Sequence, residues 1–131
     1  MGCGKSSTGR ELAVRRGARF VDLDEEIVAR EGRSIPEIFR EGGEAAFRAA
    51  ELRALRAVLD VSDASAMDTV LALGGGALTA PAARELIFAR TRCVFLRTRL
   101  ETIRERLGGA DASRPLFADA ILGLLPGRVL P

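Results

Sequence analysis

The chain has 131 residues, of which 47% are hydrophobic and 29% are charged, and its formal net charge is +2. This balance is typical of one globular domain. The sequence has no apolar run of about 18 residues that could span a membrane, and the small net charge does not indicate a nucleic-acid binder. The sequence contains no histidine, which excludes histidine metal sites and histidine general bases. Without a secretory signal pattern, we expect a cytoplasmic protein.

The first chemical signature is the stretch GCGKSS at residues 2–7, which matches the second half of a phosphate-binding loop. Gly2 and Gly4 can adopt backbone angles that turn consecutive N–H groups toward a phosphate. Lys5 is expected to neutralise the outer phosphates, and the Ser6 hydroxyl can bind Mg²⁺. The first glycine and the strand of the full pattern would lie before the chain begins, so a chance match is the alternative.

Helices and strands alternate in the predicted order along the chain. Helices are predicted over residues 6–16, 24–30, 34–39, 44–59, 79–90 and 119–125, and strands over residues 19–23, 69–73 and 92–96. Residues 61–68 read as a polar loop, and Gly42-Gly43 separates two of the helices. Ser34 and Glu37 form the pattern of a capping box with a proline between them. The alternation indicates an α/β domain with a parallel sheet.

Candidate ligand-binding residues fall where the predicted strands end. Asp22 and Asp24 follow the first strand, and the glycines of residues 74–76 follow the second. Ligands bind at the carboxyl ends of the strands in open α/β sheets, and the phosphate loop belongs at the same edge. The convergence of three candidates there indicates a phosphate-binding enzyme, although a flexible turn is the alternative for the glycines.

Arg48 occupies an unusual position in the long predicted helix. The clearest apolar line of that helix is Leu52, Leu55 and Leu59, and extending it back by one turn reaches Arg48. A charged residue that heads an apolar line points into a cleft where it needs an anionic partner. The alternative is that Arg48 pairs with Glu51, three residues on, and reaches water.

Taken together, these residues resemble shikimate kinase, a small member of the P-loop kinases. The resemblance is carried by residues 1–6, Val21-Asp22-Leu23-Asp24, Phe47-Arg48 with Glu51, Leu73-Gly74-Gly75-Gly76, Arg114-Pro115-Leu116 and Arg128. It runs along the whole chain and implies a P-loop NTPase-like α/β/α domain of three layers over residues 1–131. The implied reaction is the ATP-dependent phosphorylation of the shikimate 3-hydroxyl in aromatic amino acid biosynthesis.

The resemblance also implies a role for each matching residue. Lys5, Asp24 and Arg114 would be catalytic, and Ser6 and Asp22 would hold Mg²⁺. ATP would contact Gly2, Cys3, Gly4, Lys5, Ser6, Ser7, Arg106 and Arg114. Shikimate would contact Asp24, Arg48, Gly74, Gly75, Gly76 and Arg128, with the two arginines gripping its carboxylate. A monomer that binds ATP and shikimate, but neither nucleic acid nor membrane, is expected.

The chain departs from this family at both ends. Family members have a central strand before the phosphate loop and further segments after the position of Arg128, and both are missing here. The loss of a central strand leaves its neighbours with unpaired edges, so we expect an incomplete domain, without the first and last strands, whose activity is impaired. The alternatives are a non-catalytic module that binds nucleotide or shikimate, and another small-molecule kinase such as gluconate kinase.

Overall fold

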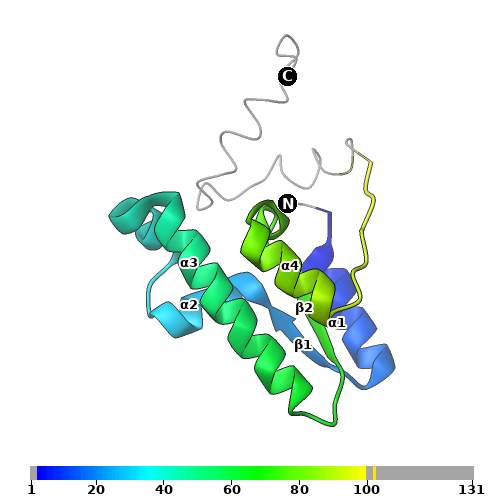
Figure 1. The fold of residues 1–131 in the computed structure, drawn as a ribbon. Coiled ribbons are helices and arrows are strands. Elements are labelled where there is room, and N and C mark those ends of the chain that lie inside the picture. The colour runs from blue at the N-terminus through cyan, green and yellow to red at the C-terminus, as the bar shows by residue number, and fades with distance from the viewer. Residues whose placement is uncertain (1–2, 100–101, 103–131) are drawn as a thin grey trace.

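A computed structural model describes residues 3–99 and residue 102, in which helices surround a small parallel sheet (Figure 1). The elements in chain order are α1 (Lys5–Arg16), β1 (Arg19–Asp22), α2 (Leu23–Glu31), α3 (Ile35–Asp63), β2 (Thr69–Ala72), a 3₁₀ turn η1 (Ala77–Thr79) and α4 (Pro81–Arg90). The two strands run parallel, with Arg19 opposite Thr69 and Asp22 opposite Ala72. The predicted α/β class with a parallel sheet is therefore confirmed.

Helices cover both faces of this sheet. Since side chains alternate in direction along a strand, each strand contacts both layers of helices. On one face α1 approaches so closely that a Cβ atom on Gly9 would lie 2.7 Å from the Phe20 ring and 3.6 Å from Val70. On the other face Leu71 packs against the hydrophobic core formed by α2, α3 and α4. The sheet therefore separates α1 from the main core.

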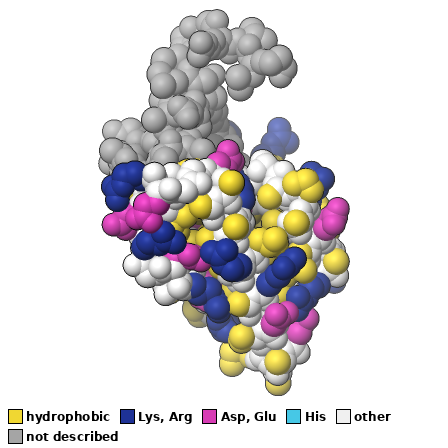
Figure 2. Space-filling view, turned by 60° about the vertical axis from the view of Figure 1, so that its left-hand side comes forward, with side chains coloured by type: hydrophobic (Ala, Val, Ile, Leu, Met, Phe, Trp, Pro, Cys, Tyr) yellow, Lys and Arg dark blue, Asp and Glu magenta, His cyan; other side chains and the backbone are white. Residues whose placement is uncertain are grey.

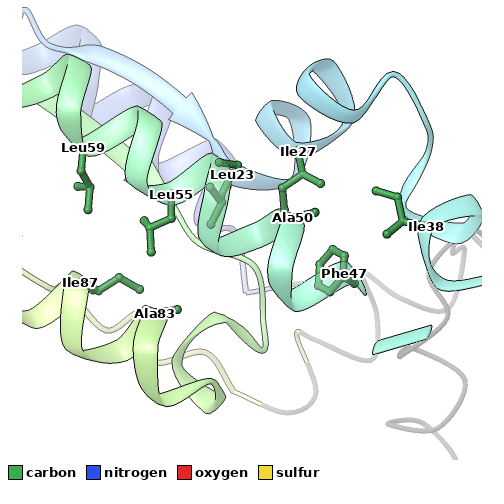
Figure 3. Close-up of a cluster of buried hydrophobic side chains, with 10 residues drawn as sticks. Leu23, Ile27, Ile38, Phe47, Ala50, Leu55, Leu59, Ala83 and Ile87 are labelled. Carbon is green, nitrogen blue, oxygen red and sulfur yellow. The ribbon is translucent and has the colours of Figure 1, made fainter. Parts of the chain in front are cut away.

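The main core lies along α3, which contributes most of the buried side chains and packs against α2 and α4 (Figure 3). Its buried side chains are Leu23 and Ile27 of α2, Ile38, Phe47, Ala50, Ala54, Leu55 and Leu59 of α3, and Ala83 and Ile87 of α4. The predicted apolar line of α3 holds for Leu55 and Leu59, but Leu52 is only half-buried. The buried face is instead continued toward the start of the helix by Glu51 and Phe47.

A kink divides α3 into the two helices predicted from the sequence. Gly43 has φ 67° and ψ −165°, which are not helical angles and which suit glycine. Ser34 begins the first part with the predicted capping box, in which Glu37 closes the reciprocal bond. The second part runs to Asp63, so the start of the predicted polar loop at residue 61 is wrong. Asp63 is held by an ion pair with Arg90 of α4, 2.7 Å long.

The prediction of a buried strand at residues 92–96 is wrong. This segment is extended but is not paired with any strand in the described part of the chain, where the sheet consists of β1 and β2 alone. Val94 is 74% exposed and Phe95 is 89% exposed. An apolar run becomes a buried strand only where a neighbouring strand supplies hydrogen bonds on its edge, and among the described residues none lies beside this run. The predicted helix at residues 119–125 lies outside the described residues.

The surface carries both positively and negatively charged side chains (Figure 2). In Figure 2, basic and acidic side chains lie near one another, with apolar side chains between them, across the face shown. Several charged side chains of the described residues form exposed ion pairs, such as Arg15 with Glu11 at 2.7 Å and Arg10 with Glu25 at 3.0 Å. No helix among residues 3–99 combines the length and the apolar composition needed to cross a membrane.

Candidate active site

The phosphate-loop residues that the structure describes lie where the chain turns into α1. Gly4 has φ 82° and ψ 23°, a left-handed conformation, and directly precedes the first residue of α1. This conformation turns the chain into the helix, whose first N–H groups lack helical partners and suit an anion. Met1 and Gly2 lie outside the described residues.

Lys5 and Cys3 contact each other at this helix start. The Lys5 ammonium donates to the Cys3 sulfur over 3.4 Å. Burial raises the pKa of the Cys3 thiol, but the charge and hydrogen bonds of Lys5 outweigh it, so the thiol pKa lies below its usual value. The Cys3 carbonyl also accepts a hydrogen bond of 3.2 Å from Thr98, a contact that sequence reasoning missed.

Ser6 and Asp22 are brought together from α1 and the end of β1. The Ser6 hydroxyl donates to one Asp22 carboxylate oxygen over 2.5 Å. The other oxygen accepts from the backbone N–H of Asp24 over 3.0 Å and so caps α2. These oxygen donors fit Mg²⁺, which uses one or two protein ligands and completes its shell with phosphate and water. The described residues contain no group of three or more acidic or cysteine side chains that would form a fuller cage.

Two carboxyl groups converge on the first glycine after β2. A Cβ atom on Gly74 would lie 3.0 Å from an Asp24 oxygen and 3.4 Å from the Glu51 Oε1 atom. Both groups therefore lie close to the main chain at Gly74, where a side chain would crowd Asp24. Asp24 reaches this point because it stands in the first turn of α2, directly after the capped strand end.

Arg48 lies against the last glycine of the same triplet. A Cβ atom on Gly76 would lie 2.5 Å from Arg48 Nη2. The opposite nitrogen, Nη1, donates to Glu51 Oε2 over 2.7 Å. The pairing of Arg48 with Glu51 is confirmed. The guanidinium also lies beside Gly76, which follows β2, and its role toward a ligand stays a prediction.

Glu51 is the charged residue of the site that sequence reasoning left out of the candidate residues. Its side chain is 1% exposed, and its Oε1 atom has no hydrogen-bond partner among the described residues. Burial raises the pKa of Glu51 against the opposing effect of Arg48, and the charge of Asp24 adds to the rise. The available signal was its position, because Glu51 stands one turn before Leu55 on the face that forms the core.

The structure therefore brings Cys3, Gly4, Lys5, Ser6, Asp22, Asp24, Arg48 and the glycines of residues 74–76 to one edge of the sheet. Ser7 stands in the first turn of α1. Arg106, Arg114 and Arg128 lie outside the described residues. The roles of all these residues remain predictions.

A left-handed glycine, a lysine and a serine at a helix start beside a strand-end aspartate define a P-loop protein of the α/β class. The shikimate kinase family profile matches residues 1–123. The chain belongs to the shikimate kinase family.

Individual relatives agree with this assignment. The shikimate kinase of Paramagnetospirillum magneticum is 42% identical over 130 residues, which are 99% of this chain and 64% of that protein. The structure of shikimate kinase from Acinetobacter baumannii in complex with shikimate matches with a TM-score of 0.78 and 39% identity, covering 88% of this chain and 62% of that one. The Bacteroides thetaiotaomicron shikimate kinase matches with a TM-score of 0.80 and 30% identity, covering 95% and 73%. The chain thus spans less than two thirds of the first two relatives.

Proposed function

We propose that this chain transfers a phosphoryl group from ATP to the 3-hydroxyl of shikimate, giving shikimate 3-phosphate and ADP. The observation that carries the proposal is the meeting of Ser6 and Asp22 with Asp24 and Arg48 at one sheet edge. Ser6 and Asp22 suit a nucleotide phosphate with Mg²⁺, whereas Asp24 and Arg48 suit a small ligand that carries hydroxyl groups and a carboxylate. The Acinetobacter baumannii relative is described in complex with shikimate, which supports this substrate.

On the nucleotide side, the N-terminus of α1 and the Lys5 ammonium hold the phosphates. Ser6 and Asp22 would hold Mg²⁺, which when bound neutralises charge on the phosphate oxygens. Cys3, Gly4 and Ser7 complete the loop around the phosphates. Phosphoryl transfer needs mainly positioning and charge stabilisation, so these groups suffice without a histidine.

On the acceptor side, Asp24 accepts a hydrogen bond from a shikimate hydroxyl and orients it, or takes its proton, for attack on the terminal phosphorus. Arg48 binds the carboxylate, the planar anion that a guanidinium grips with two parallel hydrogen bonds. The main chain of residues 74–76 offers N–H groups to the substrate. From the family resemblance we assign Arg114 to the transferring phosphoryl group, Arg106 to adenine and Arg128 to the carboxylate.

We also infer the finer architecture from the family. Residues 1–131 would form one P-loop domain of three layers, in which β1 and β2 belong to the central sheet layer. Helices on both faces of these two strands support the inference.

The test is ADP release by the 131-residue chain with Mg-ATP, measured with and without shikimate, together with ATP binding. Asp24→Asn should abolish shikimate-dependent release and leave ATP binding nearly unchanged. Glu25→Gln is the matched control, because Glu25 is the next residue of α2 but pairs with Arg10 on the surface; it should keep the parent activity. Equal loss of turnover and ATP binding in Asp24→Asn would refute the role of Asp24, and release that does not depend on shikimate would refute the substrate.

A further inference from the structure

The Arg48 guanidinium holds two carboxylates of very different character. Glu51 is buried and accepts from Nη1 over 2.7 Å. Glu44, one turn earlier, is 63% exposed, and a single oxygen of its carboxylate accepts from Nε over 3.4 Å and from Nη2 over 3.3 Å. Arg48 itself is 16% exposed. The buried contact is short and the exposed contact is long.

The exposed contact occupies the edge of the guanidinium that a ligand would need. A carboxylate binds arginine best through two parallel hydrogen bonds to one edge of the fork. Nη1 is already committed to Glu51, so the edge formed by Nε and Nη2 is the one left for such a pair. Glu44 stands on that edge with only one oxygen, at distances near the upper limit for hydrogen bonds.

The hold of Glu44 on Arg48 is weak enough to be replaced. Exposed ion pairs between residues four apart on a helix contribute little to stability. Glu44 also follows Gly43 directly, at the kink of α3, where the backbone leaves the helical conformation. Its carboxylate can therefore turn out to solvent without disturbing the buried pair of Arg48 and Glu51.

We propose that Glu44 sets the affinity of the site by occupying the Nε–Nη2 edge of Arg48 until the carboxylate of a ligand displaces it. The proposal rests on the assignment of Arg48 as the carboxylate anchor in the proposed function. The carboxylate of any ligand must therefore compete with the Glu44 carboxylate, which has the same charge, for Arg48. A simple carboxylate gains little from the exchange, whereas a ligand that also contacts Asp24 or the glycine triplet displaces Glu44 more readily.

The test is calorimetric titration of the full chain with shikimate and, separately, with cyclohex-1-ene-1-carboxylate, which carries the same carboxylate without the hydroxyls. Glu44→Gln should bind both ligands about threefold to tenfold more tightly than the parent, from the loss of an exposed ion pair and of like-charge repulsion. The matched control is Glu41→Gln, which removes one negative charge from the same helix but from a pair with Arg33. It should bind both ligands as the parent does.

The outcomes separate this inference from the proposed function. Equal or weaker binding of both ligands by Glu44→Gln, or the same gain in Glu41→Gln, overturns the role of Glu44. If the parent and Glu44→Gln both bind shikimate with equal affinity, the role of Glu44 is also overturned, even where the second ligand binds more tightly. The proposed function then still stands. If no variant binds shikimate but Glu44→Gln binds cyclohexene carboxylate more tightly, the role of Glu44 holds and the proposed function fails. If Glu44→Gln binds neither shikimate nor cyclohexene carboxylate, the role of Glu44 and the proposed function are both overturned.

Discussion

The close contact between Gly76 and Arg48 gives the most specific prediction about the site. In Gly76→Ala the new methyl carbon would lie 2.5 Å from Nη2 and 3.2 Å from both Nη1 and Cζ. Ordinary contacts between such atoms need about 3.5 Å, so the guanidinium must retreat by roughly 1 Å. Hydrogen bonds to charged groups contribute about 1.5–3 kcal/mol, so misplacing the anchor should weaken shikimate binding about tenfold to a hundredfold.

The same substitution should hardly affect folding. The guanidinium is the end of a flexible side chain and can move aside, so we expect the free energy of unfolding in urea to change by less than about 1 kcal/mol. Gly75→Ala provides the comparison, because a Cβ atom there meets nothing within 4 Å; it should weaken binding less than Gly76→Ala does. Binding to Gly76→Ala that matches the parent, measured by calorimetry, would refute the placement of Arg48 as the anchor.

Three further predictions concern pH dependence, magnesium and packing. Because the pKa of Glu51 is raised above 4.5 in the folded state, the parent should lose stability as the pH rises from that value through the raised pKa. Glu51→Gln should lack this component in urea unfolding followed across the same pH interval, and identical pH profiles would contradict it. Asp22→Asn keeps a capping side chain on α2 but should weaken binding of a fluorescent ADP analogue about tenfold with Mg²⁺ present. An equal loss in EDTA would count against a magnesium role. Gly9→Ala would place a Cβ atom 2.7 Å from the Phe20 ring and should destabilise the fold by about 1–3 kcal/mol, and a more stable variant would contradict this packing.

The local elements of the fold could be predicted from the sequence because their signals are local. Gly43 interrupts α3 where predicted, and the Ser34 cap begins it. The exposed segment with Val94 and Phe95 shows the limit of such reasoning. Its apolar composition permits a buried strand, but burial depends on a neighbour that a local pattern does not reveal.

In the site, too, some features could be predicted from local sequence signals and others depend on the packing. The strand-end aspartates and the glycine triplet were predictable, because the carboxyl ends of parallel strands meet at one edge. The pairing of Ser6 with Asp22 follows from that geometry. Glu51 was expected from the sequence only as a partner of Arg48, and Glu44 was not expected to contact Arg48. That Glu51 is buried while Glu44 is exposed follows from the packing of α3.

The burial of Glu51 has a consequence for engineering this protein. A carboxylate in a hydrophobic core is costly, and exchanging a buried ion pair for well-packed apolar side chains often stabilises a protein. A redesign of α3 guided by stability alone would therefore replace Glu51 with leucine, together with an apolar residue in place of Arg48. If Arg48 is the carboxylate anchor that we propose, this variant would gain stability and lose carboxylate binding, because a binding site and the most stable core place opposite demands on these two positions.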